Sequence, residues 1–149
     1  MADYTLAVDP GVSGGMALWE RDGDVTLRKF TTECEFIEYV RNLSGRCRSV
    51  VEHVPKYVGN EMRASHSFTL GYNVGFEIGV LRALEIPVDL VRPQKWQHGL
   101  HGLKGKAGAP RKRLLKDHAL RLYPGLKVTL ATADALLILD HYLNGECRL

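Results

Sequence analysis

Three acidic residues stand where their carboxylates can converge, and their type limits the chemistry that they can do. Asp9 and Glu52 each end a predicted strand, and Asp134 lies in the first turn of a predicted helix. Carboxylates at strand ends meet in the crevice where open α/β sheets bind ligands. Such hard oxygen donors suit Mg²⁺ or Mn²⁺, and two such ions can activate a water for in-line displacement at a phosphodiester.

Each acid also has an ordinary structural explanation. Asp9 precedes Pro10-Gly11 and suits a turn, Glu52 suits an exposed strand end, and the helix dipole favours Asp134 near a helix N-terminus. For any single acid this explanation is the better supported one. The three together, in this order along an alternating pattern of strands and helices, favour a metal-binding catalytic site.

A basic segment lies in the second half of the chain. Its cations, with no acidic residue among them, are Lys104, Lys106, Arg111, Lys112, Arg113 and Lys116. The net charge of +3 says little by itself, but charge concentrated in one segment suits a phosphate backbone, because each neutralised phosphate releases condensed counterions. An isolated charge run is more commonly a solvated helix face beside a flexible loop. The segment is therefore a candidate nucleic-acid contact with solvation as its alternative.

Hydrophobic periodicity predicts the elements that must position these residues. Alternating apolar residues and the turn signal Asp22-Gly23 indicate an antiparallel hairpin near the start of the chain, and a capping box of Thr32 and Glu35 opens the first helix. The predicted strands are residues 4–9, 15–20, 25–30, 49–52 and 88–91, and the predicted helices are 32–43, 67–84, 110–123 and 132–143, the last capped by Thr132; a polar loop is predicted at 56–65. This order predicts an α/β fold of three layers.

Length and composition bound the class of protein. A chain of 149 residues with 45% hydrophobic content predicts one compact domain, residues 1–149. No apolar run approaches the roughly 20 residues that span a bilayer, and the N-terminus lacks the features of a signal peptide, so we expect no membrane association and a cytoplasmic location. Cys34, Cys47 and Cys147 are widely spaced and odd in number, which predicts reduced thiols.

Three glycines recur at every fourth residue of the long predicted helix 67–84. They are Gly71, Gly75 and Gly79, and each lowers helix propensity by about 1 kcal/mol relative to alanine. A close backbone contact on that helix face would explain them. The contacting surface is predicted to be either the sheet or a partner subunit.

Aromatic residues offer further candidate contacts. Phe68 and Tyr72 lie one helical turn apart, where they can stack on unpaired nucleic-acid bases or pack in the core. We retain Phe68 as a nucleic-acid contact, whereas a core position is favoured for Tyr72. Trp96 could support a DNA-facing loop, but a buried anchor is the favoured interpretation.

Several motifs, taken together, point to one family. They are Leu6-Ala7-Val8-Asp9-Pro10-Gly11 with Gly14-Gly15, Val50-Val51-Glu52-His53, the run from Ser67 to Gly75, Ile86-Pro87-Val88, Arg92-Pro93-Gln94-Lys95-Trp96, Leu122-Tyr123-Pro124 and Ala133-Asp134-Ala135-Leu136. In these motifs the sequence resembles the RuvC class of Holliday junction resolvases of the ribonuclease H-like superfamily, particularly bacteriophage-type members. The resemblance spans nearly the whole chain.

The resemblance implies a three-layer fold whose central mixed five-stranded sheet starts with an antiparallel hairpin, continues with parallel strands and is flanked by helices. It further implies a homodimeric, Mg²⁺-dependent crossover junction endonuclease that binds four-way DNA and nicks two opposed strands in recombination and repair. By position, Asp9, Glu52 and Asp134 match the family's metal ligands. Lys106 and Lys112 are candidates for its catalytic lysine, and Lys112 is preferred because it opens a predicted helix.

The sequence departs from the family pattern at one ligand. The family usually carries an Asp or His three or four residues before the acid that matches Asp134, but Leu130 and Ala131 occupy those places. Asp140 falls on nearly the opposite helix face, and His141 lies about 10 Å along the axis, so neither substitutes easily.

Two other functions stay open, and the second follows from this departure. One is a nuclease of the YqgF type, or one that acts on branched DNA other than four-way junctions. The other is a junction-binding protein that cleaves weakly or not at all, whose binding would not depend on Asp9.

Overall fold

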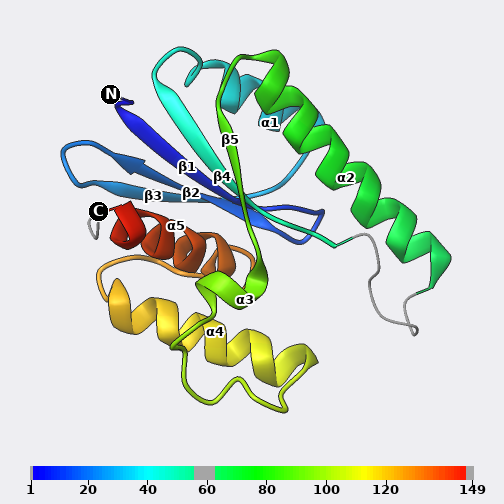
Figure 1. Ribbon diagram of the computed structural model, residues 1–149, viewed down its shortest axis with the longest axis vertical. Helices are drawn as coiled ribbons and strands as arrows, with labels where there is room; N and C mark the ends of the chain where they lie inside the picture. Colours follow the sequence, from blue (N-terminus) through cyan, green and yellow to red (C-terminus); the bar gives the residue numbers. More distant parts are fainter. Residues whose placement is uncertain (1, 56–62, 147–149) are drawn as a thin grey trace.

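A five-stranded mixed sheet organises the chain, with helices on both faces (Figure 1). The computed structural model describes residues 2–55 and 63–146. The strands, in the order β3-β2-β1-β4-β5 across the sheet, are β1 (Tyr4–Asp9), β2 (Gly15–Glu20), β3 (Val25–Lys29), β4 (Cys47–Glu52) and β5 (Val88–Val91). The helices are α1 (Glu33–Arg41), α2 (Ala64–Ala83), α3 (Pro93–Trp96), α4 (Gly108–Leu122) and α5 (Ala133–Glu146).

The strand pairing confirms the predicted mixed sheet. Strands β1, β2 and β3 pair antiparallel, and the β2–β3 turn contains Gly23, whose φ of 107° suits glycine and whose N–H donates to the Glu20 carbonyl at 2.8 Å. Strand β4 then pairs parallel with β1, and β5 pairs parallel with β4. Parallel pairing needs a crossover, and α1 and α2 supply the two crossovers.

Side chains along each strand alternate between two hydrophobic cores, because successive residues point to opposite faces of a sheet. Leu6, Val8 and Val51 join the core beneath α1 and α2. Ala7 and Val50 join the core against α5. Helix α4 packs chiefly on α5, outside the layer that covers the sheet (Figure 1).

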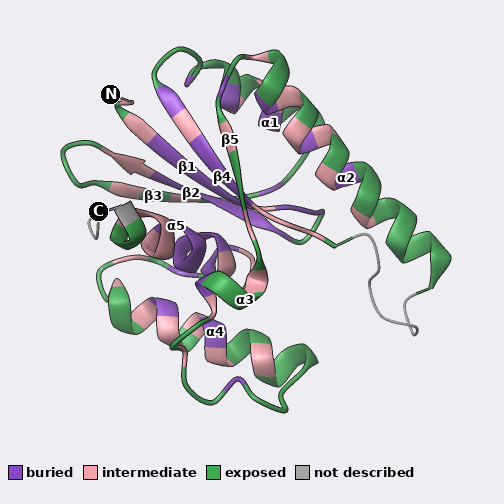
Figure 2. Ribbon diagram, viewed as in Figure 1, coloured by how far each residue is buried: buried purple, intermediate pink, exposed green. Residues whose placement is uncertain are grey.

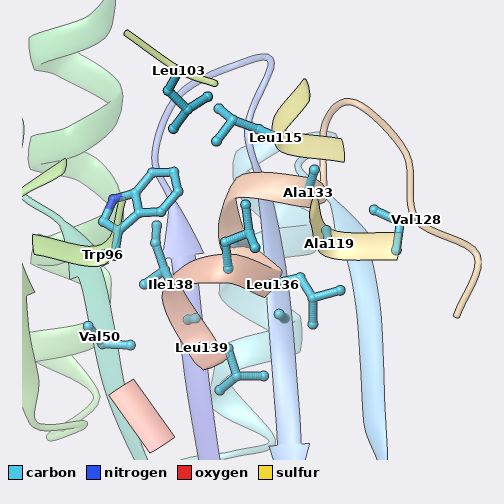
Figure 3. Close-up of a cluster of buried hydrophobic side chains, with 14 residues drawn as sticks. Val50, Trp96, Leu103, Leu115, Ala119, Val128, Ala133, Leu136, Ile138 and Leu139 are labelled. Atoms are coloured by element: carbon cyan, nitrogen blue, oxygen red, sulfur yellow. The ribbon is translucent and has the colours of Figure 1, made fainter. Parts of the chain in front are cut away.

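The core between the sheet and α5 holds the C-terminal helix in place (Figure 3). Leu136, Ile138 and Leu139 of α5 are fully buried. Burial of such a side chain contributes about 1.5–3 kcal/mol. Trp96 of α3 and Leu115 of α4 extend the same cluster. The start of α5 is thereby fixed against the sheet.

Two glycines allow the turn after β1 to pack tightly. A Cβ on Gly14 would lie 2.0 Å from the Asp9 carbonyl oxygen, and a Cβ on Gly15 would lie 2.5 Å from the Ala131 carbonyl oxygen. Both neighbours are backbone atoms, so rotation of a side chain could not relieve either clash. The Gly14-Gly15 pair therefore brings the β1–β2 turn close to the turn that precedes α5.

The predicted boundaries shift by no more than three residues. Helix α2 begins at Ala64 instead of residue 67, because no helix breaker lies between Arg63 and that point and alanine favours helix. Helix α4 begins at Gly108 instead of residue 110, and the short helix α3 was not predicted. Of the predicted loop 56–65, residues 56–62 lie outside the described part of the chain, and the last two belong to α2.

Of the two predicted caps, the one at Thr32 is confirmed. Thr32 is the N-cap of α1, and its hydroxyl accepts from the Glu35 N–H at 3.2 Å. The reciprocal half of the capping box differs from the prediction, because the Glu35 carboxylate accepts a hydrogen bond from the Thr31 hydroxyl. Thr132 directly precedes α5, and its hydroxyl accepts from the Thr129 N–H at 3.0 Å, which closes the turn leading into the helix.

The outer face of α2 contacts no other part of the described chain at its glycines. A Cβ added at Gly71, Gly75 or Gly79 would have no described heavy atom within 4 Å outside the helix's own backbone. The prediction that these glycines pack on the sheet is therefore wrong, because the buried positions of α2 are Asn73, Glu77 and Leu81 on the opposite side. Contact with a partner subunit stays a prediction.

The aromatic pair on α2 is also outside the core. The Phe68 side chain is 76% exposed and that of Tyr72 is 53% exposed, and their rings stack with centroids 6.5 Å apart. The interpretation of Tyr72 as a core residue is therefore wrong. Figure 2 shows why: the first half of α2 extends beyond the sheet and is largely exposed.

Two expectations from composition can be compared with the structure. No described helix is both long enough and apolar enough to cross a bilayer. Cys34 and Cys47 are free, which agrees with the predicted reduced thiols, and Cys147 lies outside the described residues.

Candidate metal and nucleic-acid site

Two neighbouring strands place their terminal acids at one edge of the sheet. Strands β1 and β4 are parallel neighbours with Val8 opposite Val51, so Asp9 and Glu52 follow at the same level. The two acids also share a face, because each lies two residues after a side chain in the α5 core. That face is the one against which α5 packs.

The start of α5 brings the third acid to the same place. Asp134 lies in the first turn of α5, which packs on β1, β2 and β4. The pKa of Asp9 is raised well above its ordinary value, first by burial and then by the charges of Asp134 and Glu52. The charge of Asp134 likewise adds to the effect of burial on Glu52, whose pKa rises to about 7. Three sequence-distant acids thus interact across one small region.

Burial is the main reason that these carboxyl groups resist ionisation. It is also the leading cause of the raised pKa of Asp134, where the charges of Lys112 and Arg111 act in the opposite direction. A buried carboxylate is unfavourable unless it is paired or coordinates a metal. Additional positive charge among the three acids would therefore lower the free energy of the folded protein at neutral pH.

The three carboxylates suit a hard divalent cation that keeps several waters, and they do not form a preformed metal cage. Among the described residues, no three Asp, Glu, His or Cys side chains are already grouped closely enough to hold a metal ion. Mg²⁺ commonly binds through one or two carboxylates, keeps several waters and gains further ligands from substrate phosphates. Asp9, Glu52 and Asp134 supply the carboxylates for such a site, whose remaining ligands would be water and substrate.

Two cations of α4 lie beside the acids, and they differ in exposure and in hydrogen bonding. Lys112 is exposed, and its charge lowers the pKa of both Asp9 and Asp134. Arg111 is half buried, where its guanidinium donates to the Leu103 carbonyl at 3.3 Å and to the Gln97 side chain. Lys112 is consequently the better candidate for contact with a substrate phosphate, and Arg111 mainly ties α4 to the segment after α3.

The other predicted nucleic-acid contacts lie on two sides of the acids. Lys104 and Lys106 are exposed on the connection between α3 and α4, and Arg113 is exposed on α4. Phe68 projects from α2, which covers the opposite face of the sheet in Figure 1. The basic segment and the aromatic pair therefore flank the strand ends from different sides.

Sequence reasoning missed a buried acid next to the β1–β2 turn. Glu77 of α2 is only 1% exposed, and its Oε2 has no hydrogen-bond partner among the described atoms. Burial raises its pKa to about 8, and a hydrogen bond from the Gly11 backbone acts in the opposite direction. Helical spacing gave a usable signal, because Asn73, Glu77 and Leu81 recur every fourth residue on one face.

The residues at the two positions of the fourth ligand carry no ligating side chain, and the two candidates on α5 have other surroundings. Leu130 is 46% exposed, and Ala131 contributes its carbonyl to the tight contact with Gly15. Asp140 accepts a hydrogen bond from the Tyr123 hydroxyl at 3.0 Å, and His141 lines a cavity next to β5. That neither residue easily substitutes for the fourth ligand stays a prediction.

The layers and strand order described above are those of the ribonuclease H-like fold. The chain is similar to RuvC of Thermus thermophilus, with a TM-score of 0.58 over 96% of each chain at 18% sequence identity. It is equally similar to T. thermophilus RuvC in complex with a Holliday junction substrate, with the same TM-score, coverage and identity. The RuvC resemblance of the sequence motifs is thus confirmed for the fold. The sequence matches no protein-family model and no curated protein sequence.

Proposed function

We propose that this protein is a homodimeric, structure-selective endonuclease that resolves four-way DNA junctions in recombination and repair. The observation that carries the proposal is that β1, β4 and the start of α5 place Asp9, Glu52 and Asp134 at one edge of the sheet, in a chain whose fold matches that of RuvC. The charge of Lys112 acts on two of these acids. The match to a RuvC structure that contains a Holliday junction substrate supports four-way DNA as the ligand. The phage-like motifs of the sequence support a bacteriophage-type member.

The three acids would hold Mg²⁺ or Mn²⁺, two ions in all, next to the scissile phosphate. When bound, such ions supply an activated water and stabilise the leaving oxygen of an in-line displacement. Lys112 would contact a phosphate oxygen and offset the negative charge that develops there. Lys104, Lys106 and the exposed part of the basic segment would bind the DNA backbone on either side of the cleaved bond.

The decisive experiment compares an end-labelled synthetic four-way junction with a matched linear duplex. Each substrate is incubated with the protein in Mg²⁺, in Mn²⁺ and in EDTA. Paired, ligatable nicks on the junction alone, in the presence of either metal, are the expected result. Cleavage of duplex and junction at equal rates would contradict structure selection, and cleavage of single strands or RNA in preference would favour a YqgF-like nuclease.

Replacement of Lys112 should slow nicking and shift its dependence on pH. Lys112→Gln removes the charge that lowers the pKa of Asp9 and Asp134, so both acids ionise at higher pH and bind metal less readily. We expect nicking to fall by about 10²-fold to 10³-fold, as for loss of one transition-state contact, with the acidic limb of the pH profile moved upward. Lys127→Gln, which removes an exposed lysine outside the basic segment, is the charge-matched control. An unchanged pH profile in Lys112→Gln would refute this role.

The proposed dimer would use the outer face of α2, where a Cβ added at any of the three glycines would have no described heavy atom within 4 Å outside the helix's own backbone. Gly75→Leu should disrupt a close contact between two copies of this face, while the isolated helix gains about 1 kcal/mol from loss of a glycine. Sedimentation equilibrium should therefore show monomers without a drop in melting temperature. Gly145→Leu on α5, another helical glycine with open space around it, should stay dimeric. A dimer in both variants would place the interface elsewhere.

A second candidate function is junction binding without cleavage. It is favoured by the absence of a ready metal-binding group among the described residues and by Leu130 and Ala131 at the places of the fourth ligand. The cleavage experiment separates the two functions, because selective binding with no nicks in either metal would support the second.

A further inference from the structure

We infer that Trp96 is a positioning residue for Glu52: its indole N–H holds one oxygen of the carboxylate and so orients the other toward a bound cation. This inference rests on the proposed function, because it concerns the same carboxylates. The observation behind it is a hydrogen bond of 2.8 Å from Trp96 Nε1 to Glu52 Oε2, between residues 44 positions apart in the sequence.

The indole is held too firmly to be an incidental partner. Trp96 is 3% exposed and belongs to the core that also contains Val50, two residues before Glu52 on β4. It ends the short helix α3, which begins with Pro93 shortly after β5. Figure 3 shows the indole within the side chains of this core. A donor fixed on this scaffold restricts the rotation of the Glu52 side chain.

The chemistry of the pair suits a metal ligand. An indole nitrogen can only donate, so the bond engages Oε2 as an acceptor and leaves Oε1 as the oxygen available to a cation. The bond also favours the ionised carboxylate, which is the form that binds metal. Partners that orient a metal ligand in this way typically change metal affinity or activity by about 10–100-fold when they are removed.

The alternative is that Trp96 merely fills the core. A packing role predicts that Trp96→Phe lowers stability but leaves the affinity for metal unchanged. A positioning role predicts a weaker metal site in a folded protein. Trp19→Phe is a matched control, because Trp19 packs on the same core and carries no hydrogen bond to Glu52 in the described structure.

The first test measures Mn²⁺ affinity from the electron paramagnetic resonance signal of free Mn²⁺, without substrate. We expect the dissociation constant of Trp96→Phe to rise about 10–100-fold, and nicking to recover as Mn²⁺ is increased, while Trp19→Phe matches the wild type. An unchanged dissociation constant in a folded Trp96→Phe protein would overturn the inference and leave the proposed nuclease intact. A wild type that neither binds Mn²⁺ nor nicks junctions would overturn the proposed function as well.

A second test does not require Trp96 to be replaced. In Trp19→Phe, Trp96 is the only tryptophan, and paramagnetic Mn²⁺ bound at Glu52 should quench its fluorescence. Adding Glu52→Gln should abolish the saturable quenching. Saturable Mn²⁺ binding that leaves the Trp96 emission unchanged would contradict the inference even if Trp96→Phe does not fold.

Discussion

Asp9→Asn is expected to abolish junction nicking while the protein continues to fold and to bind junctions. Asp9 is one of the three carboxylates proposed to hold metal, and its pKa is raised first by burial and then by the charges of Asp134 and Glu52. We expect a fall in rate of about a thousandfold or more, which corresponds to about 4 kcal/mol of activation free energy. The rate is measured on the end-labelled junction at saturating Mg²⁺.

The same variant should be more stable than the wild type when metal is absent. The substitution replaces a buried carboxyl that is repelled by its neighbours with a neutral amide, so the melting temperature in EDTA should rise and the increase caused by Mg²⁺ should shrink. Asp3→Asn, at the exposed start of the chain and at the far end of β1, should change neither the rate nor the melting temperature. Nicking by Asp9→Asn at the wild-type rate would refute the assignment of the metal site.

Stability in EDTA is expected to fall as the pH rises from about 5 to 9. The folded protein raises the pKa of Glu77 to about 8 and of Glu52 to about 7, and raises those of Asp9 and Asp134 as well. Above the ordinary pKa of these acids the unfolded chain has released its protons while the folded chain retains them. Folding then takes up protons, so each unit of pH increase opposes it by about 1.4 kcal/mol per group until the folded pKa is passed.

One substitution and the addition of Mg²⁺ should each remove a separate part of the stability that is lost as the pH rises. Glu77→Gln keeps the size of the side chain but has no charge to bury, so it should exceed the wild type by several kcal/mol at pH 9 and match it near pH 5. Mg²⁺ binds the ionised forms of Asp9, Glu52 and Asp134, so it should stabilise the wild type most at high pH. The two effects should be nearly additive, because Glu77 makes only the smallest contribution to the pKa of Asp9.

Urea unfolding followed by circular dichroism, at pH 5, 7 and 9 with and without Mg²⁺, measures both effects. Glu38→Gln, an exposed glutamate on α1, should behave as the wild type at every pH. Stability that is independent of pH in EDTA would show that the acids are already compensated in solution, and the account of the site would have to change.

Much of the fold follows from local sequence signals. Alternating apolar residues predicted β1, and the turn signal around Gly23 predicted the β2–β3 hairpin, because strand faces and tight turns are set by nearest neighbours along the chain. The sequence also predicted that Asp9 and Glu52 each end a strand, and these strands are β1 and β4. Parallel strands meet at the same edge of a sheet, so the order of elements was enough to predict that Asp9 and Glu52 converge.

Only the tertiary structure decided which side chains meet across the layers. The hydrogen bond from Trp96 to Glu52 joins α3 to β4, and the buried Glu77 lies beneath the turn that holds Gly11. The Trp96–Glu52 bond leaves no signal in the spacing of residues. Helical spacing places Glu77 on the buried face of α2 but does not reveal which turn it meets, since each contact depends on how helices pack on the sheet. The three glycines on the outer face of α2 likewise show what sequence spacing alone cannot predict. Helical periodicity locates Gly71, Gly75 and Gly79 on one face, but which face the sheet buries is decided by packing over the whole domain.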